Sequence, residues 1–290
     1  MEIVAGILSV LVAAVVASSA LNSRKLTRAV WVRRLVLLVG FSGALIAGGV
    51  IWFGLIPGTP LDEGTLATAG DALTLSEGEA GRLSITLKPP EGDARSHGVV
   101  NVQLHVRGEA GKRVNQTRFQ IGDTKARADD EKAPAEEFLA TNVRIPRVGA
   151  DARVELASMS PPDRGKVEVA YYPDLIPLPL LVWVLFGLAA LAGAFEGAAA
   201  SSYRRSFFTV SLAGAATLAW LLQDGMAPDK GIWDVAIRVG YALASGAIAG
   251  TLGPPLLGFL LPSLPGEEDA EGASPPAAGS STEGSDEEPA

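Results

Sequence analysis

The sequence predicts a membrane α plus all-β protein: five transmembrane helices, two before and three after an antiparallel β-sandwich of about seven strands. Two observations predict this class. The apolar residues of the 290-residue chain stand in long blocks almost free of charge, and the charged residues lie between these blocks. Between the second and third blocks the pattern changes to alternating apolar and polar residues, which is typical of half-buried strands.

Five apolar segments approach the roughly 20 residues that a helix needs to cross the bilayer core. They are residues 3–21, 35–56, 175–195, 207–222 and 235–261. The fourth segment is the shortest. The fifth contains Gly253-Pro254-Pro255, which predicts a break or kink late in the helix. Unwound backbone there could line a path through the membrane, although a structural kink is the simpler interpretation.

The basic residues predict the orientation of these segments. The loop 22–34 carries five cations and no acid, and Arg204 and Arg205 follow the third segment. Because short cytoplasmic loops are enriched in Lys and Arg, we expect the N-terminus outside and this loop in the cytoplasm. An alternative makes the first segment a cleaved signal peptide ending near Ser18 and Ala20. Only Glu2 precedes its apolar run, however, and a signal peptide begins with basic residues.

The C-terminal residues 263–290 predict a disordered, acidic, cytoplasmic tail. Eight acids and no basic residue occur from Pro265 onward, and they account for the whole formal net charge of −8. The rest of the tail is rich in Pro, Gly, Ser and Ala, so it cannot bury a core. No basic surface argues for a nucleic-acid partner. The absence of cysteine excludes disulfides and thiolate chemistry.

Residues 57–174 predict the sandwich, on the extracytoplasmic side. The run 99–106 alternates apolar and polar residues, and shorter runs repeat this period as far as residue 171. An immunoglobulin-like or a jelly-roll sandwich would fit, without the Cys and Trp markers of a true immunoglobulin domain. We expect the segment 123–137 to be a solvated loop. Short connections to the helices on both sides should hold the sandwich close to the membrane.

One motif in the second apolar segment is similar to a catalytic motif. Gly40-Phe41-Ser42-Gly43 matches the G-x-S-G motif of rhomboid-type intramembrane proteases. Its serine would need a base within hydrogen-bond reach, and both histidines, His97 and His105, lie in the predicted sandwich. Small residues that pack helix against helix explain the motif better.

The histidines and acids of the predicted sandwich lack the spacing of a metal site. His97 and His105 have no convergent third ligand, and Asp129-Asp130-Glu131 lacks the pattern of a calcium loop. The fragment 108–112 (GEAGK) joins two strands, which predicts a hairpin rather than a phosphate loop. Residues 115–117 form an N-x-T sequon. We therefore predict no catalytic, metal-binding or cofactor-binding residues, and no cofactor.

The helices show few chemical features. Glu196 and Arg238 stand near the ends of their segments, where side chains can reach the interface, so no charge is expected at the midplane. Gly246 and Gly250, and the pair 44 and 48, are spaced for close helix contact. Whether these residues pack within the chain or between copies of it is left open, so helix–helix oligomerisation is possible.

The favoured interpretation is a non-enzymatic binding or complex-assembly protein of the plasma or bacterial inner membrane. Its sandwich would contact an envelope component or a partner subunit, and its helices would contact the lipid bilayer. The alternative is a transporter or channel component in which the five helices are the functional part and the sandwich is a cap. An enzyme ranks third, because no nucleophile–base pair, metal set or cofactor motif is present.

Overall fold

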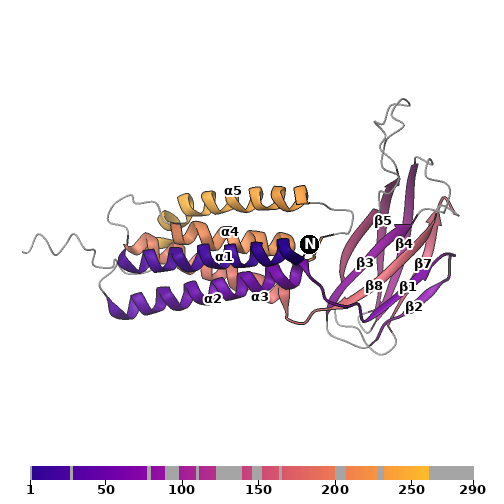
Figure 1. Ribbon diagram of the computed structural model, residues 1–290, viewed down its shortest axis with the longest axis horizontal. Coiled ribbons are helices and arrows are strands. Elements are labelled where there is room, and N and C mark those ends of the chain that lie inside the picture. Colours follow the sequence, from indigo (N-terminus) through magenta and orange to yellow (C-terminus); the bar gives the residue numbers. More distant parts are fainter. Residues whose placement is uncertain are drawn as a thin grey trace, which may run out of the picture.

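The computed structural model describes residues 2–26, 29–76, 80–88, 98–108, 111–121, 139–145, 152–162, 165–199, 207–226 and 232–260. A bundle of helices lies along the long axis of the molecule, and two β-sheets stand at one end of it (Figure 1). The predicted helices and strands therefore separate into two bodies, with the β-rich body inserted between the second and third helices.

All five apolar segments form helices. They are α1 (Glu2–Ser23), α2 (Val30–Leu55), α3 (Leu178–Ala199), α4 (Phe207–Leu222) and α5 (Ile232–Leu257). Four of these described helices are long and apolar enough to cross a membrane. The exception is α4, whose 16 residues span about 24 Å at about 1.5 Å per residue, less than the roughly 30 Å of a bilayer core.

Two predictions about helix ends are wrong. Helix α2 begins at Val30, so Arg33 and Arg34 belong to its first turns rather than to a loop. Helix α5 continues through Pro254 and Pro255 to Leu257 and ends in a 3₁₀ turn, Gly258–Leu260. Each proline lacks the N–H that would donate to the carbonyl four residues earlier, yet the helix continues through both residues. The fifth helix is therefore not broken at this point.

Small residues bring the helices into close contact within the chain. A Cβ atom at Gly40 would overlap the side chain of Ala20 on α1. One at Gly246 would overlap the Val210 carbonyl on α4, and one at Gly197 the Pro254 carbonyl on α5. Because no Cβ intervenes, the backbones approach closely enough for dispersion contacts. Gly40 packs against α1, as the helix-contact interpretation of the G-x-S-G motif predicts, and Gly246, for which packing within or between chains was left open, packs within this chain.

The β-rich body contains eight described strands in two four-stranded sheets. The strands are β1 (Asp62–Leu66), β2 (Ala72–Thr74), β3 (Gly81–Lys88), β4 (Gly98–Gly108), β5 (Gly111–Ile121), β6 (Leu139–Ile145), β7 (Arg153–Ser160) and β8 (Lys166–Pro173). One sheet, sheet A, has the order β1-β8-β3-β6, and the other, sheet B, has the order β2-β7-β4-β5. All pairs are antiparallel.

The two sheets bury one apolar core between them. The alternation that predicted the strands also predicts the faces, because Leu83, Ile85 and Leu87 of β3 and Val100, Val102 and Leu104 of β4 all lie in this core. The sequence pattern does not predict strands β1 and β2. Among the buried core residues, β1 contributes only Leu66, and β2 has only three residues, so neither shows a clear alternation.

The remaining sequence predictions in the sandwich have mixed outcomes. The fragment 108–112 is a hairpin connection, since Gly108 and Gly111 are paired across β4 and β5. The sequon 115–117 lies in β5. His105 lies on β4 with its side chain half-buried, beside Glu155 of β7. The predicted loop 123–137, His97, Asp129-Asp130-Glu131 and the tail 263–290 lie outside the described residues.

Candidate functional site at the junction of the sandwich and the helices

Two arginines on the outer face of sheet A point towards the helices. Arg82 follows Gly81 at the start of β3, and Arg144 lies near the end of β6, directly opposite it in the register. Their neighbours Leu83 and Ile145 are buried in the core. Because successive side chains of a strand point to opposite faces, both arginines point out of the sandwich. They stand at the end of the sheet that adjoins the helices.

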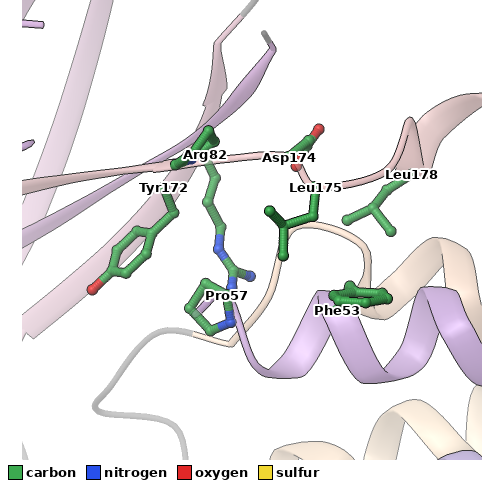
Figure 2. Close-up of a pocket in the computed structure, with 8 residues that line it drawn as sticks. Phe53, Pro57, Arg82, Tyr172, Asp174, Leu175 and Leu178 are labelled. Atoms are coloured by element: carbon green, nitrogen blue, oxygen red, sulfur yellow. The ribbon is translucent and has the colours of Figure 1, made fainter. Parts of the chain in front are cut away.

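Arg82 binds the C-terminal end of α2. Its side chain is buried, and its Nη1 donates a hydrogen bond of 2.6 Å to the carbonyl oxygen of Gly54. The guanidinium also lies 5.7 Å from the centre of the Tyr172 ring. Figure 2 shows this side chain extending from β3 towards α2, with Pro57 and Tyr172 beside it. A cation is favourable at a helix C-terminus because the last carbonyl groups carry partial negative charge.

Arg144 joins the sandwich to the connection after α4. Its Nε donates to Asp224 Oδ1 at 2.8 Å, and its Nη2 donates to the Gln223 carbonyl at 2.9 Å. Its Nη1 donates to Asp174, between β8 and α3. Asn142 adds a bond of 3.1 Å from Nδ2 to the Asp224 carbonyl. One guanidinium therefore holds three segments of the chain together, using the fork geometry that Lys lacks.

Glycine is required where the connection after α4 meets Arg82. Gly225 has a φ of 75°, in the left-handed region, and a Cβ atom there would overlap the Arg82 guanidinium. The same connection is held from α5, since Arg238 Nη1 donates to the carbonyl oxygen of Leu221. Three arginines thus bind carbonyl groups at the C-terminal ends of α2 and α4, two of them from the sandwich.

Burial at this junction shifts the pKa values of Arg82 and Asp174 in the direction that disfavours the charged form of each side chain. Desolvation lowers the pKa of Arg82 to about 10, and the negative charge of Asp174 partly opposes this shift. Desolvation also raises the pKa of Asp174, against the influence of Arg144. Arg82 therefore remains a cation at neutral pH. Each buried charge is unfavourable alone, so the junction is stable because the charges are paired and hydrogen-bonded.

The hollow at the junction is too small for an organic ligand. It is lined by Phe53, Pro57, Arg82, Tyr172, Pro173, Asp174, Leu175 and Leu178 (Figure 2). Its volume of about 10 Å³ is about the least space that can hold one water molecule. The residues around this hollow join the sandwich to the helices.

A second charged site lies at the opposite end of the helices. Glu196 of α3 is only 2% exposed, and one carboxylate oxygen accepts the N–H of Phe208 at 3.0 Å. The other accepts the N–H of Thr209 at 2.9 Å and its hydroxyl group. Ser23 of α1 donates a further bond of 3.2 Å. The carboxylate thus caps the N-terminus of α4, where a negative charge is favourable.

The prediction that the Glu196 side chain reaches the membrane interface is wrong, and Arg238 has a binding partner that the sequence did not indicate. The sequence placed both side chains at the membrane interface. Glu196 is instead buried among α1, α3 and α4, because its four hydrogen bonds replace those that water would supply. Arg238 lies partly buried and bound to the end of α4. No pattern in the sequence indicates these partners. Those on α4 lie on the neighbouring helix in the chain, and Ser23 lies 173 residues from Glu196.

Within the described parts of the chain, the other sequence motifs do not assemble into a site. Gly40 and Gly43 of the G-x-S-G motif pack against Ala20 and Leu212, as expected for helix contact. His105 lies in sheet B, away from α2. Among the described residues, no group of three or more histidines or acids could hold a metal ion. The junction arginines were not singled out in the sequence. Their position at the strand ends nearest the helices is the signal that could have indicated them.

Comparisons with known proteins assign no family to this chain. No protein-family model matches it, and no curated protein and no solved structure is significantly similar to it. The interpretation of the molecule therefore depends on its own geometry.

Proposed function

We propose that the chain is a multi-pass protein of the plasma or bacterial inner membrane whose five helices all cross the bilayer. The N-terminus and the sandwich would lie on the extracytoplasmic side, and the acidic tail in the cytoplasm. The support is the cationic turn between α1 and α2, which lies at the end of the bundle opposite the sandwich. The positive-inside rule places such a turn in the cytoplasm. The short α4 would be accommodated by local thinning of the bilayer.

We further infer that the sandwich is a jelly roll. Its strand orders β1-β8-β3-β6 and β2-β7-β4-β5 place the first strand beside the last and the second beside the seventh. Two interleaved Greek keys give this order, which defines the double-sheet jelly roll. Folds of this class occur in many binding domains, but the fold alone does not identify a ligand.

The sandwich then acts as a non-enzymatic binding or complex-assembly module for an envelope component or a partner subunit. One observation carries this proposal: in the described part of the chain, the polar contacts between the sandwich and the helices come from β3, β6 and Asp174, all on the side of sheet A. The outer face of sheet B therefore points away from this mount. A module fixed by one sheet can present the other sheet in a defined orientation.

The outer face of sheet B is polar on β4 and β7, where its side chains are described. Its described side chains on β4 and β7 alternate with the core residues, and they are Asn101, Gln103, His105, Arg107, Arg153, Glu155, Ser158 and Ser160. Arg107 and Glu155 form an ion pair of 3.2 Å, and the Ser158 hydroxyl lies 3.4 Å from Gln103 Oε1. Amide, hydroxyl and charged groups of this kind suit hydrogen bonding to a polar partner surface.

The test compares one substitution on each sheet. Ser158→Arg places a bulky cation on the outer face of sheet B, and Thr65→Arg places the same group on the outer face of sheet A, where Thr65 is also exposed. The full-length variants are cross-linked in intact membranes and the attached components are identified. We expect Ser158→Arg to lose components that Thr65→Arg retains. Recovery of the same components after deletion of residues 60–172 would overturn the proposal.

One feature favours the transport alternative. Glu196 is the single buried carboxylate among the described helical residues, and buried acids in a membrane commonly mark ion or proton paths. Its hydrogen bonds to Ser23, Phe208 and Thr209 already satisfy both oxygens, which favours a structural role. Retained ion or proton flux of the Glu196→Gln protein in liposomes, equal to that of the wild-type protein, would remove the reason for this alternative.

A further inference from the structure

At the end of the bundle opposite the sandwich, the ends of α1, α3 and α5 lie close to the start of α4. Ser23, the last residue of α1, donates to Glu196 near the end of α3, and Glu196 binds the first residues of α4. Gly197 of α3 lies against Gly258, at the end of α5. The turn between α1 and α2 and the point at which the chain leaves α5 therefore lie at the same end of the molecule (Figure 1).

This end carries exposed cations, whereas the chain that leaves it is acidic. Arg24 and Lys25 are exposed directly after α1, and Arg34 is exposed in the first turns of α2; these three residues form what we call the cationic α1–α2 turn. Residues 22–34 contain no acid. Beyond Leu260 the chain continues for 30 residues, and four acids stand within residues 267–271. The two sets are opposite in sign and similar in number.

We infer that residues 267–271 (Glu267, Glu268, Asp269, Ala270 and Glu271) bind the cationic α1–α2 turn of the same chain, and that anionic lipid headgroups compete for this turn. Glu267 follows Leu260 by seven residues, which span up to about 24 Å when extended. Neighbouring helices lie about 8–10 Å apart, so the acids can reach across the bundle from α5 to α1 and α2.

The energies involved favour a contact between residues 267–271 and the α1–α2 turn that depends on the charge of the bilayer. An exposed ion pair contributes about 0–1 kcal/mol, so no single pair holds the segment. Tethering raises its effective concentration to about the millimolar range, and several pairs act together. An anionic bilayer offers each basic residue about 1 kcal/mol, which is comparable. The acidic segment should therefore occupy the turn in a neutral bilayer and leave it when anionic lipid is present.

The test uses the full-length chain, which has no natural cysteine. Spin labels at Asn22→Cys, an exposed site at the end of α1, and at Ala270→Cys report the distance between turn and tail in nanodiscs. In phosphatidylcholine alone we expect a population at short distance. It should be lost in about 1 M salt, where the Debye length is about 3 Å, and when Arg24, Lys25 and Arg34 are all changed to Gln.

A matched pair of tail variants identifies the occupant. Neutralising Glu267, Glu268, Asp269 and Glu271 to the corresponding amides should abolish the short-distance population. Neutralising Glu283, Asp286, Glu287 and Glu288, which removes the same number of charges, should retain it. A short-distance population that survives the first variant, or that is absent in phosphatidylcholine, overturns the inference. Phosphatidylglycerol should shift the distances to longer values, and unchanged distances would overturn the competition with lipid.

Discussion

The two ends of the helical bundle bind charge in opposite ways. At the end that meets the sandwich, Arg82, Arg144 and Arg238 bind carbonyl groups at the C-termini of α2 and α4. At the other end, the single carboxylate of Glu196 binds N–H groups at the N-terminus of α4. Both arrangements match the sign of the helix dipole. They differ in the number of side chains involved, because three arginines bind carbonyl groups at the first end and one buried acid binds N–H groups at the second.

The largest effect should follow from removal of the single acid. Glu196→Ala leaves the buried N–H groups of Phe208 and Thr209 and the Ser23 hydroxyl without their acceptor. We expect a loss of about 2–4 kcal/mol in the free energy of unfolding, measured by denaturant titration in mixed micelles. Glu196→Gln keeps one carbonyl acceptor and should lose about half as much. Equal stability of Glu196→Ala and the wild-type protein would show that the cap is unimportant.

A glycine pair on α2 tests whether close helix contact, rather than a catalytic serine, explains the G-x-S-G motif. Gly40→Ala places a Cβ atom in the space of Ala20, whereas a Cβ atom at Gly49 meets no atom within 4 Å. We expect Gly40→Ala to destabilise the protein by about 1–3 kcal/mol and Gly49→Ala to be neutral or slightly stabilising. The same unfolding titration measures both. Equal effects of the two substitutions would contradict the packing shown for α1 and α2.

At the sandwich end, the shared arginines should make each substitution less severe. Arg144→Ala removes bonds to Asp174, Gln223 and Asp224, and leaves the largely buried Asp174 without its closest cation. We expect a cost of about 1–3 kcal/mol, with faster hydrogen exchange in the residues that join β8 to α3. Arg107→Ala, which breaks the more exposed pair with Glu155, should cost about 0–1 kcal/mol. A larger effect of Arg107→Ala would reverse the comparison.

The smallest effect concerns pH. Burial raises the pKa of Asp174 in the folded chain above its ordinary value of 3.8. At a pH between the ordinary pKa of 3.8 and the raised pKa of the folded chain, Asp174 holds a proton in the folded chain that it has lost in the unfolded chain. The free energy of unfolding therefore falls as the pH rises through this range. Asp174→Asn should remove that slope from melting temperatures measured across the window. Glu63→Gln, at an exposed site on β1, serves as the control and should leave the slope unchanged.

These features differ in how far the sequence could predict them. Hydrophobic blocks predicted all five helices, and alternation predicted β3, β4, β5, β6, β7 and β8, because burial of one face imposes a period on the local sequence. Strands β1 and β2 carry too few core residues to show that period. The predicted end of α5 was wrong because the prolines were expected to break the helix, whereas the helix continues through them to Leu257.

The two charged sites could not be predicted from the local sequence, because their partners lie elsewhere in the chain. Glu196 binds residues of α1 and α4, and Arg144 binds residues that lie 30 to 80 positions away in the chain. Each side chain is typical of a surface residue when only its neighbours in sequence are considered. The unpaired N–H groups at the start of α4 bind a carboxylate, and the unpaired carbonyl groups at its end bind guanidinium groups. Only the packing of α4 against the other elements shows which residues supply them.

The central claim is that sheet A fixes the sandwich on the helices, which leaves sheet B in a defined orientation. The most direct test measures distances between spin labels at Ser158→Cys on β7 and Leu180→Cys on α3, both exposed sites. In nanodiscs, we predict one narrow distance distribution for this pair. Adding Arg82→Ala and Arg144→Ala together should broaden it. A broad or multiple distribution in the protein with both arginines intact would contradict the account.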